Sequence, residues 1–187
     1  NAFEQLMRVN TRFCVDWANA QLASGASAIV YFDPVSSPTI LPPDMYRRTG
    51  WHIAKDTLSQ IQGPTSTSFA SGRTLAILDD VAQTGTVGVG VSANEDLAQV
   101  KAICKGRLTV MGNLNGIEMR RWSAADAEHA VKDAIAKAGP GGGFLLMDNH
   151  GEIPFQVPEA VLLAIAEAVH KWGQYPLDWT ADHDKRE

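Results

Sequence analysis

A pattern of short apolar runs, each ending abruptly in small polar residues, recurs along the chain. Continuous apolar runs of this length are typical of strands that are buried on both faces, as in parallel sheets. A stretch with helical character follows each run, so the alternation predicts an α/β fold built from βα units. The predicted strands are residues 28–32, 67–70, 87–91, 108–111 and 144–147.

The stretches between these runs have apolar residues at helical spacing and residues that are typical of helix ends. The segment Ser123-Ala124-Ala125-Asp126 resembles a capping box, in which a hydroxyl and a carboxylate satisfy the first free amides of a helix. We expect a single domain over residues 1–187, with a polar tail at 178–187 that frays. The predicted helices are residues 3–24, 44–61, 74–83, 95–104, 123–138 and 158–172.

The polar residues that close the runs form the candidate site, because the carboxyl ends of parallel strands share one ligand-binding rim. Asp33 is a candidate catalytic carboxylate that orients or protonates a substrate. Alternatively, it caps its own loop, since Asp before Pro commonly starts a turn. His150 is the second catalytic candidate, as a general acid or as a donor to a substrate carboxylate. The alternative for His150 is a loop histidine bonded to backbone.

Other rim residues are candidates for substrate binding. Arg73 is a cation that can pair with a substrate carboxylate. Ser71 and Gly72 precede a predicted helix and can bind an anion through backbone amides, or simply cap that helix. Asn113 can bond a ligand through its amide, or form the turn from strand to helix. The full set is Ser37, Ser71, Gly72, Arg73, Asn113 and Asn149.

Composition narrows the classes of protein that the chain can represent. Its 187 residues are 45% hydrophobic and 20% charged, which is ordinary for a globular protein. The net charge of −5 gives no footprint for nucleic acid, and no apolar run approaches the roughly 20 residues of a membrane helix. The two cysteines lack metal-ligand spacing and suit a reducing compartment, so we expect a cytoplasmic protein. We also expect a small-molecule substrate.

Five βα units are fewer than the eight of a closed (β/α) barrel. The chain begins with Asn1-Ala2 rather than Met, which fits a cloning remnant, a processed end or a truncated end. The units are therefore too few to close a TIM-type barrel, and we expect an open parallel sheet. Its two unpaired edges and open apolar interior predict association into a homo-oligomer.

Three phrases in order along the chain resemble the C-terminal part of the uroporphyrinogen decarboxylase superfamily. They are residues 20–46, which include Asp33-Pro34-Val35-Ser36-Ser37-Pro38, residues 112–115, which read Gly-Asn-Leu-Asn, and residues 142–159. The resemblance covers about residues 11–175. The superfamily also contains methylcobamide:coenzyme M methyltransferases and related corrinoid methyltransferases, and its fold is a (β/α)₈ barrel. The resemblance implies that this chain forms the final five units, a partial TIM-type barrel.

The resemblance leaves the activity open. The Asp-Pro-x-x-Ser-Pro phrase favours the corrinoid methyltransferase branch, in which a partner protein carries the cobamide and no cofactor is tightly bound. The Asn149-His150-Gly151 phrase is closer to the decarboxylase branch, so decarboxylation of a porphyrinogen acetate group is the alternative. A third interpretation is a non-catalytic remnant or assembly subunit.

The metal ligands of the methyltransferase branch are replaced in this chain. That branch holds zinc with a His-x-Cys pair and a second Cys near the last strand. The matching pair here is Phe69 and Ser71, and the later position offers His150 and Gly151. A phenyl ring does not ligate, and a serine hydroxyl is a poor zinc ligand. We therefore predict no metal site.

Overall fold

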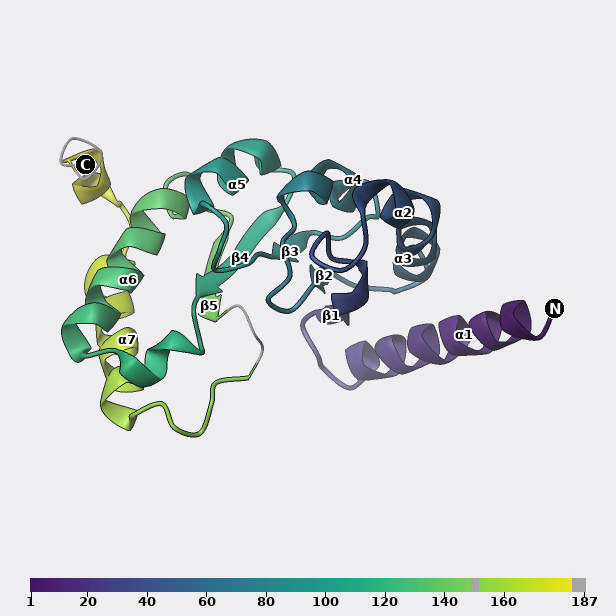
Figure 1. Ribbon diagram of the computed structural model, residues 1–187, viewed down its shortest axis with the longest axis horizontal. Coiled ribbons are helices and arrows are strands. Elements are labelled where there is room, and N and C mark those ends of the chain that lie inside the picture. The colour runs from purple at the N-terminus through teal and green to yellow at the C-terminus, as the bar shows by residue number, and fades with distance from the viewer. Residues whose placement is uncertain (149–151, 183–187) are drawn as a thin grey trace.

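The computed structural model describes residues 1–148 and 152–182. Its five strands form one parallel sheet whose spatial order follows the chain order, from β1 to β5 (Figure 1). Helical crossovers join successive strands, as parallel pairing requires. The strands are β1 (Ile29–Phe32), β2 (Thr65–Ser68), β3 (Gly88–Gly90), β4 (Thr109–Leu114) and β5 (Phe144–Asp148).

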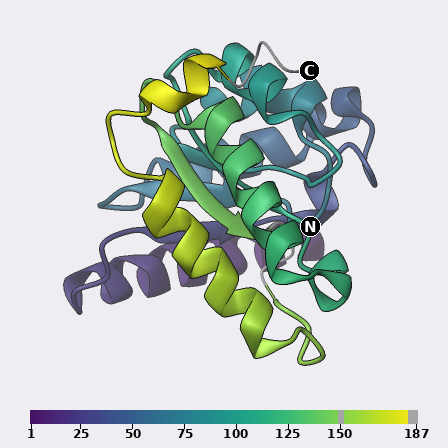
Figure 2. The same cartoon turned by 90° about the vertical axis from the view of Figure 1, so that its left-hand side faces the viewer.

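The helices are arranged around the sheet, and α6 and α7 cover the end beside β5 (Figure 2). The capping box that begins α6 is confirmed: the amide of Asp126 donates to Ser123 Oγ at 3.2 Å, and Asp126 Oδ2 accepts from the Ser123 amide at 2.8 Å. The α-helices are α1 (Ala2–Ala23), α2 (Pro43–Arg48), α3 (Gly50–Leu58), α4 (Leu78–Ala82), α5 (Leu97–Cys104), α6 (Ala124–Ala138) and α7 (Glu159–Trp172).

The helix-covered face of the sheet carries the main core. Val89 and Val110 are fully buried against apolar side chains of α4 and α5, such as Val81 and Val100. A second cluster joins the end of β4 to α6 and α7 and includes Val131. Burying one such aliphatic side chain contributes about 1.5–3 kcal/mol. These clusters fix the strands against their crossover helices and so set the positions of the loops at the strand ends.

The opposite face of the sheet, which we call the inner face, is open. The exposed fractions of Phe32 and Leu145 are 61% and 55%, although both are large apolar residues. Small residues occupy the middle of this face. One row of register partners crosses all five strands: Phe32, Ser68, Gly90, Met111 and Leu145.

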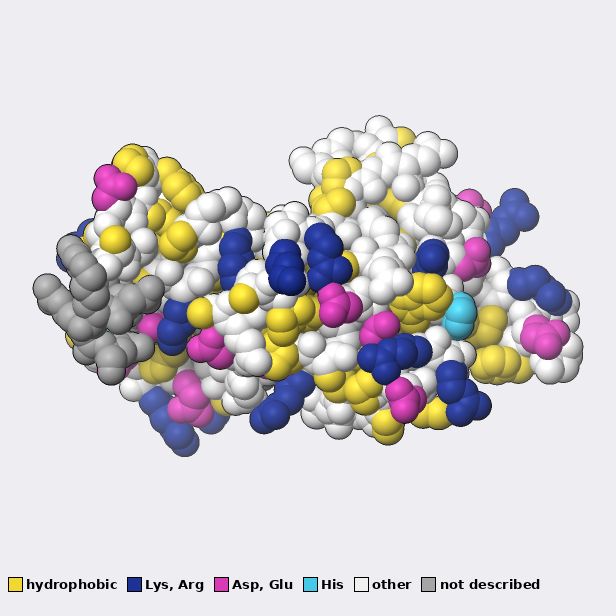
Figure 3. Space-filling model, turned by 90° about the horizontal axis from the view of Figure 1, so that it is seen from above, with side chains coloured by type: hydrophobic (Ala, Val, Ile, Leu, Met, Phe, Trp, Pro, Cys, Tyr) yellow, Lys and Arg dark blue, Asp and Glu magenta, His cyan; other side chains and the backbone are white. Residues whose placement is uncertain are grey.

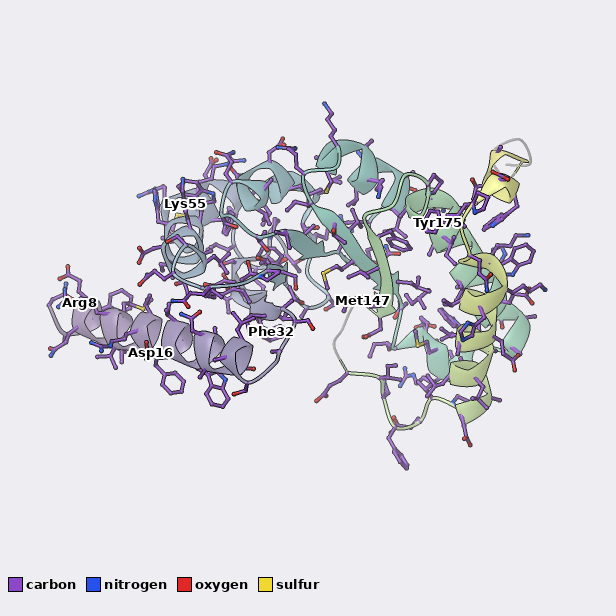
Figure 4. The ribbon with its side chains drawn as sticks, turned by 180° about the vertical axis from the view of Figure 1, so that it is seen from behind. Arg8, Asp16, Phe32, Lys55, Met147 and Tyr175 are labelled. Carbon is purple, nitrogen blue, oxygen red and sulfur yellow. The ribbon has the colours of Figure 1, made fainter. Side chains whose placement is uncertain are left out.

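The sheet is a partial barrel that does not close. In the described residues β1 pairs with β2 alone and β5 pairs with β4 alone, so each edge strand has one unpaired side. Phe32 and Met147 mark these two edge strands in Figure 4. Helix α1 projects from the body (Figure 1) and contacts α3. Its apolar side chains Phe13 and Trp17 are exposed.

Several predicted boundaries differ from the structure. The second strand begins at Thr65 and ends before Phe69, so it consists of Thr and Ser rather than apolar residues. The predicted helix 44–61 is two helices, with Thr49 between them at φ −131° and ψ −83°. The predicted helix 74–83 is a 3-10 helix, Leu75–Ile77, followed by α4.

The polar tail that we predict to fray, residues 178–187, begins with a helical segment. Asp178–Asp182 form a 3-10 helix, and the remaining residues of the tail lie outside the described residues. The Trp179 ring lies edge-on to Trp172, with their centroids 5.2 Å apart. Its indole N–H donates to the Trp172 carbonyl at 3.1 Å. This aromatic contact packs the 3-10 helix Asp178–Asp182 against the end of α7.

Candidate functional site

The loops that follow β1, β2 and β3 meet at the carboxyl edge of the sheet and are tied together by side-chain hydrogen bonds. Ser37 and Thr39 come from the first loop, Arg73 and Thr74 from the second, and Glu95 from the third. Each bond joins residues more than twenty positions apart in the sequence. The sequence-predicted rim therefore exists as a connected structure, which we call the rim network.

Asp33 ends β1 at this edge and is half-buried. Its carboxylate accepts a hydrogen bond from the Ser36 amide at 3.3 Å and so caps the 3-10 helix Pro34–Ser36. This is the capping role that the Asp-Pro sequence predicted as one of two alternatives. A single long bond leaves other oxygen lone pairs for a ligand, so the two roles are compatible.

Two tyrosines lie near Asp33. Burial, together with the nearby negative charge of Asp33, raises the pKa of the Tyr31 phenol to about 12. The same two causes raise the pKa of Tyr46, which is buried and lies edge-on to Phe69. Both phenols therefore stay protonated at any physiological pH and present neutral hydroxyls on the side of the rim that faces the helices.

The raised pKa of Tyr31 predicts that the protein loses stability at high pH. Its folded-state pKa of about 12 exceeds the unfolded value of about 10, so its contribution is complete below pH 10 and is lost as pH rises through 12. We expect the urea midpoint to fall across this window, and to fall less in Tyr31→Phe. Phenolate absorbance at 295 nm, read in Tyr175→Phe to remove the exposed tyrosine, should stay low until about pH 11. Full ionisation by pH 10 in the folded protein would contradict this assignment.

Ser37 and Gly72 pack against each other below the rim surface. Ser37 has no exposed area, and its hydroxyl donates to the Arg73 carbonyl at 3.0 Å and accepts from the Thr39 amide at 3.1 Å. A methyl group on Gly72 would overlap the Ser37 side chain. The structure therefore places both predicted substrate-binding residues where they join two loops, with the Ser37 hydroxyl already committed.

Ser71 and Arg73 are the predicted substrate-binding residues with exposed side chains. The backbone of Arg73 is held on both sides: its amide donates to Thr39 Oγ1 at 3.0 Å, and its carbonyl accepts from Ser37. Its side chain lines a cavity of about 570 Å³ between the rim loops and the start of α5. Of the predicted rim residues, Arg73 therefore offers a ligand the clearest positive charge.

Glu95 is the central residue of the rim network, and it did not figure among the sequence candidates. Its carboxylate is almost fully buried and accepts four hydrogen bonds: from the Thr74 amide at 2.6 Å, the Leu75 amide at 2.6 Å, the Thr74 hydroxyl at 2.9 Å and the Ser92 amide at 3.2 Å. The spacing Ser92-x-x-Glu95 is the capping-box pattern, and that signal was available in the sequence. Its partners in the preceding loop were not.

Asn113 lies inside β4 rather than in a turn, because the strand continues to Leu114. Its side-chain amide donates to the carbonyls of Ser92 at 2.8 Å and Glu95 at 2.9 Å. Both amide hydrogens are therefore used to anchor the loop after β3. The side-chain oxygen remains the atom through which Asn113 can meet a ligand.

His150 and Asn149 lie outside the described residues, as does Gly151. Asp148 is the last residue of β5 and lies next to them in the chain. Their predicted roles therefore remain predictions.

The positions that match the zinc ligands of the methyltransferase branch do not fit a metal. The Phe69 ring is buried in the core against Tyr46, and Ser71 is exposed on the rim. Within residues 1–148 and 152–182, no three His, Cys, Asp or Glu side chains are grouped closely enough to hold a metal ion.

We predict that the purified protein binds no stoichiometric zinc. Elemental analysis after dialysis should give well below one zinc per chain, since the two aligned ligand positions carry Phe69 and Ser71. Restoring ligands with the double variant Phe69→His and Ser71→Cys is the positive control for the assay. One tightly held zinc in the unmodified chain would contradict the prediction and would point to His150 with partners elsewhere.

Charged side chains of both signs are interspersed with apolar ones on the face seen in Figure 3. None of the helices over the described ranges is long and apolar enough to cross a membrane.

An open sheet of parallel strands with crossover helices and a polar rim at the carboxyl ends defines a partial (β/α) barrel. The sequence profile described as Uroporphyrinogen decarboxylase (URO-D) matches residues 1–172. The chain therefore belongs to the uroporphyrinogen decarboxylase family. This confirms the resemblance that the three phrases indicated.

Individual relatives come from both branches. The chain is 30% identical over 114 residues to "Methylcobamide:CoM methyltransferase MtaA" of Methanosarcina barkeri, covering 60% of this chain and 33% of that protein. It is 26% identical over 178 residues to a uroporphyrinogen decarboxylase of Cupriavidus pinatubonensis, covering 91% of this chain and 48% of the relative. The chain thus spans half or less of the length of these relatives.

A solved structure shares the fold. A methyltransferase from Methanosarcina mazei superposes with a TM-score of 0.78 at 23% identity, and the match covers 88% of this chain and 48% of that one. At this identity the likeness establishes the architecture alone. It confirms the predicted TIM-type fold class and its partial extent.

Proposed function

We propose that this protein is a methyltransferase-like enzyme of the uroporphyrinogen decarboxylase superfamily. A small-molecule acceptor binds at the rim, and a partner protein supplies the cobamide. The observation that carries the proposal is the carboxyl edge of the sheet, where the rim network holds exposed Arg73 and where half-buried Asp33 follows β1 and caps its own loop. The identity with the methyltransferase of Methanosarcina barkeri and the Asp33–Pro38 phrase favour the methyl-transfer branch.

The residues of this chain have distinct roles in the proposed reaction. Arg73 binds the anionic end of the acceptor through its guanidinium. The Asp33 carboxylate orients the acceptor and holds the proton that its thiol or hydroxyl loses. When bound, the cobamide supplies the methyl group for transfer. The protein contributes position and charge, because an oriented acceptor reacts far faster than a free one.

The inner face is compatible with a large flat cofactor near the rim. A methyl group built on Gly90 would meet no atom closer than 3.5 Å, so no bulky side chain presses on this position, although β3 itself is buried. Ser68 lies beside Gly90 in the same register row. A corrin and a porphyrinogen are both broad macrocycles, so this open floor supports either branch of the family.

The reaction is tested with methylcobalamin as methyl donor and 2-mercaptoethanesulfonate as acceptor. We expect loss of free thiol and loss of the methylcobalamin spectrum, both dependent on the protein. A parallel assay with uroporphyrinogen III measures release of carbon dioxide. Decarboxylation without methyl transfer would establish the alternative branch. Absence of both activities, together with absence of binding, would favour the non-catalytic assembly subunit.

His150→Ala tests the general acid of either branch. We expect turnover to fall by roughly 10²-fold, the usual contribution of a positioned acid or base. His129→Ala is the matched control, because His129 is exposed on α6 and far from the rim in the sequence. The melting temperature should be unchanged in both variants. Unchanged turnover and ligand affinity in His150→Ala would remove His150 from the site and shift the catalytic role to Asp33.

A further inference from the structure

Side chains from the two neighbouring loops bind backbone groups of Arg73 and of the two residues that follow it. The Arg73 amide donates to Thr39, and the Arg73 carbonyl accepts from Ser37. The next two amides, of Thr74 and Leu75, both donate to Glu95 Oε1 at 2.6 Å. The segment is thus held from two sides: the loop after β1 holds Arg73, and Glu95 holds Thr74 and Leu75, where the 3-10 helix Leu75–Ile77 begins.

The carboxylate of Glu95 accepts from the first amides of the 3-10 helix Leu75–Ile77, where a negative charge is favourable. A buried carboxylate is costly to desolvate, and here four donors offset that cost. Neutral side chains such as Ser or Asn commonly satisfy loop amides at lower cost. The positions of the Thr74 and Leu75 amides are therefore strongly fixed. Arg73, which directly precedes them, keeps an exposed side chain beside a cavity.

Some of the charged groups that line this cavity already make hydrogen bonds within the protein, and one is available to a ligand. The Glu95 carboxylate is occupied by backbone amides, and the Asp96 carboxylate accepts from the Gln99 amide at 2.8 Å and caps α5. Arg73 is the cation in the same lining. The rest of the wall includes apolar groups such as Leu75 and Ile103. A volume of about 570 Å³ is in the range of small-molecule sites.

We propose that Glu95 is a positioning residue, which holds Arg73 as the recognition group for an oxyanion, either carboxylate or sulfonate, of a ligand in this cavity. The proposal rests on the proposed function in identifying that ligand as the substrate. Glu95 acts through the backbone and does not touch the ligand. An arginine on a fixed backbone loses less conformational freedom on binding, which improves affinity without any new contact.

The test is anion binding in the intact chain, monitored by NMR through the backbone amide resonances of Gly72, Thr74 and Leu75, which every variant retains. The probes are 2-mercaptoethanesulfonate and propionate, titrated separately at constant ionic strength. We expect saturable shifts in the unmodified chain and none in Arg73→Gln. In Glu95→Gln, which keeps the size and one acceptor oxygen, we expect the Kd to rise by about fivefold or more. Arg48→Gln, at an exposed arginine of α2, is the control and should leave the Kd unchanged.

A second variant keeps the test decisive if Glu95→Gln does not fold. Thr39→Val removes the acceptor of the Arg73 amide at an exposed position and should raise the Kd in the same direction. If the role of Glu95 is merely structural, Glu95→Gln will lower the melting temperature and leave the Kd of the folded protein unchanged. That outcome overturns the proposal. Because binding is measured without turnover, saturable binding in a protein without methyl transfer would sink the proposed function alone.

Discussion

Replacing Gly72 with Ala is expected to lower the free energy of unfolding by about 3 kcal/mol, the upper end of the usual cost of overpacking. The added methyl would overlap both side-chain atoms of Ser37 and would lie 2.9 Å from the Phe69 carbonyl oxygen. Ser37 cannot move aside freely, because its hydroxyl bonds to Arg73 and Thr39. For a chain of this size the melting temperature should fall by roughly 6–12 °C.

Gly90→Ala is the matched control for this substitution. A methyl at Gly90 meets the Ser68 side chain at 3.5 Å or more, which is ordinary van der Waals contact. We expect stability to be unchanged or slightly higher, since Ala restricts the unfolded chain more than Gly. Adding Ser37→Gly to Gly72→Ala should recover part of the loss. Equal stability of the two single variants in urea unfolding would show that the loops after β1 and β2 are not in contact.

The sheet was predictable from the sequence where its strands are apolar. Val89 and Val110 face the helices and are fully buried, and the runs around them have the continuous apolar character of central parallel strands. The second strand was predicted at residues 67–70 but spans Thr65–Ser68, because Thr65 and Thr67 rather than apolar residues occupy its buried face. The Thr65 carbonyl accepts from the Thr86 hydroxyl at 2.9 Å. That bond satisfies the Thr65 backbone, whereas the Thr67 hydroxyl is buried without a hydrogen-bond partner among the described residues, so hydrogen bonding does not account for threonine at position 67.

The candidate site was predictable as a rim but not as a network. Strand ends identified Asp33 and Arg73, since all parallel strands present their carboxyl ends on one side. The role of Glu95 depends on contacts with Thr74 and Leu75, twenty or more residues earlier, and no local pattern specifies that approach. Likewise, Ser37 and Gly72 are 35 positions apart and become partners only when two crossovers place their loops together.

Replacing Trp17 and Phe32 with Lys is expected to convert an associated form of this chain into a monomer. Both side chains are about 60% exposed, and their residues line one groove of about 530 Å³ between α1 and the unpaired edge of β1. Exposed apolar patches and unpaired strand edges drive association. We therefore expect the unmodified 187-residue chain to be a dimer or larger in light scattering.

Lysine at these two positions should act by charge repulsion and by desolvation cost, since natural edge strands use lysine to prevent pairing. Phe155→Ser is the matched control, because Phe155 is fully exposed yet lies in the segment between β5 and α7. If apolar exposure alone caused association, this control would also dissociate the protein. Dissociation restricted to the Trp17 and Phe32 variant would place the interface at α1 and β1. A monomeric unmodified chain at high concentration would instead mean that the open edge is tolerated in solution.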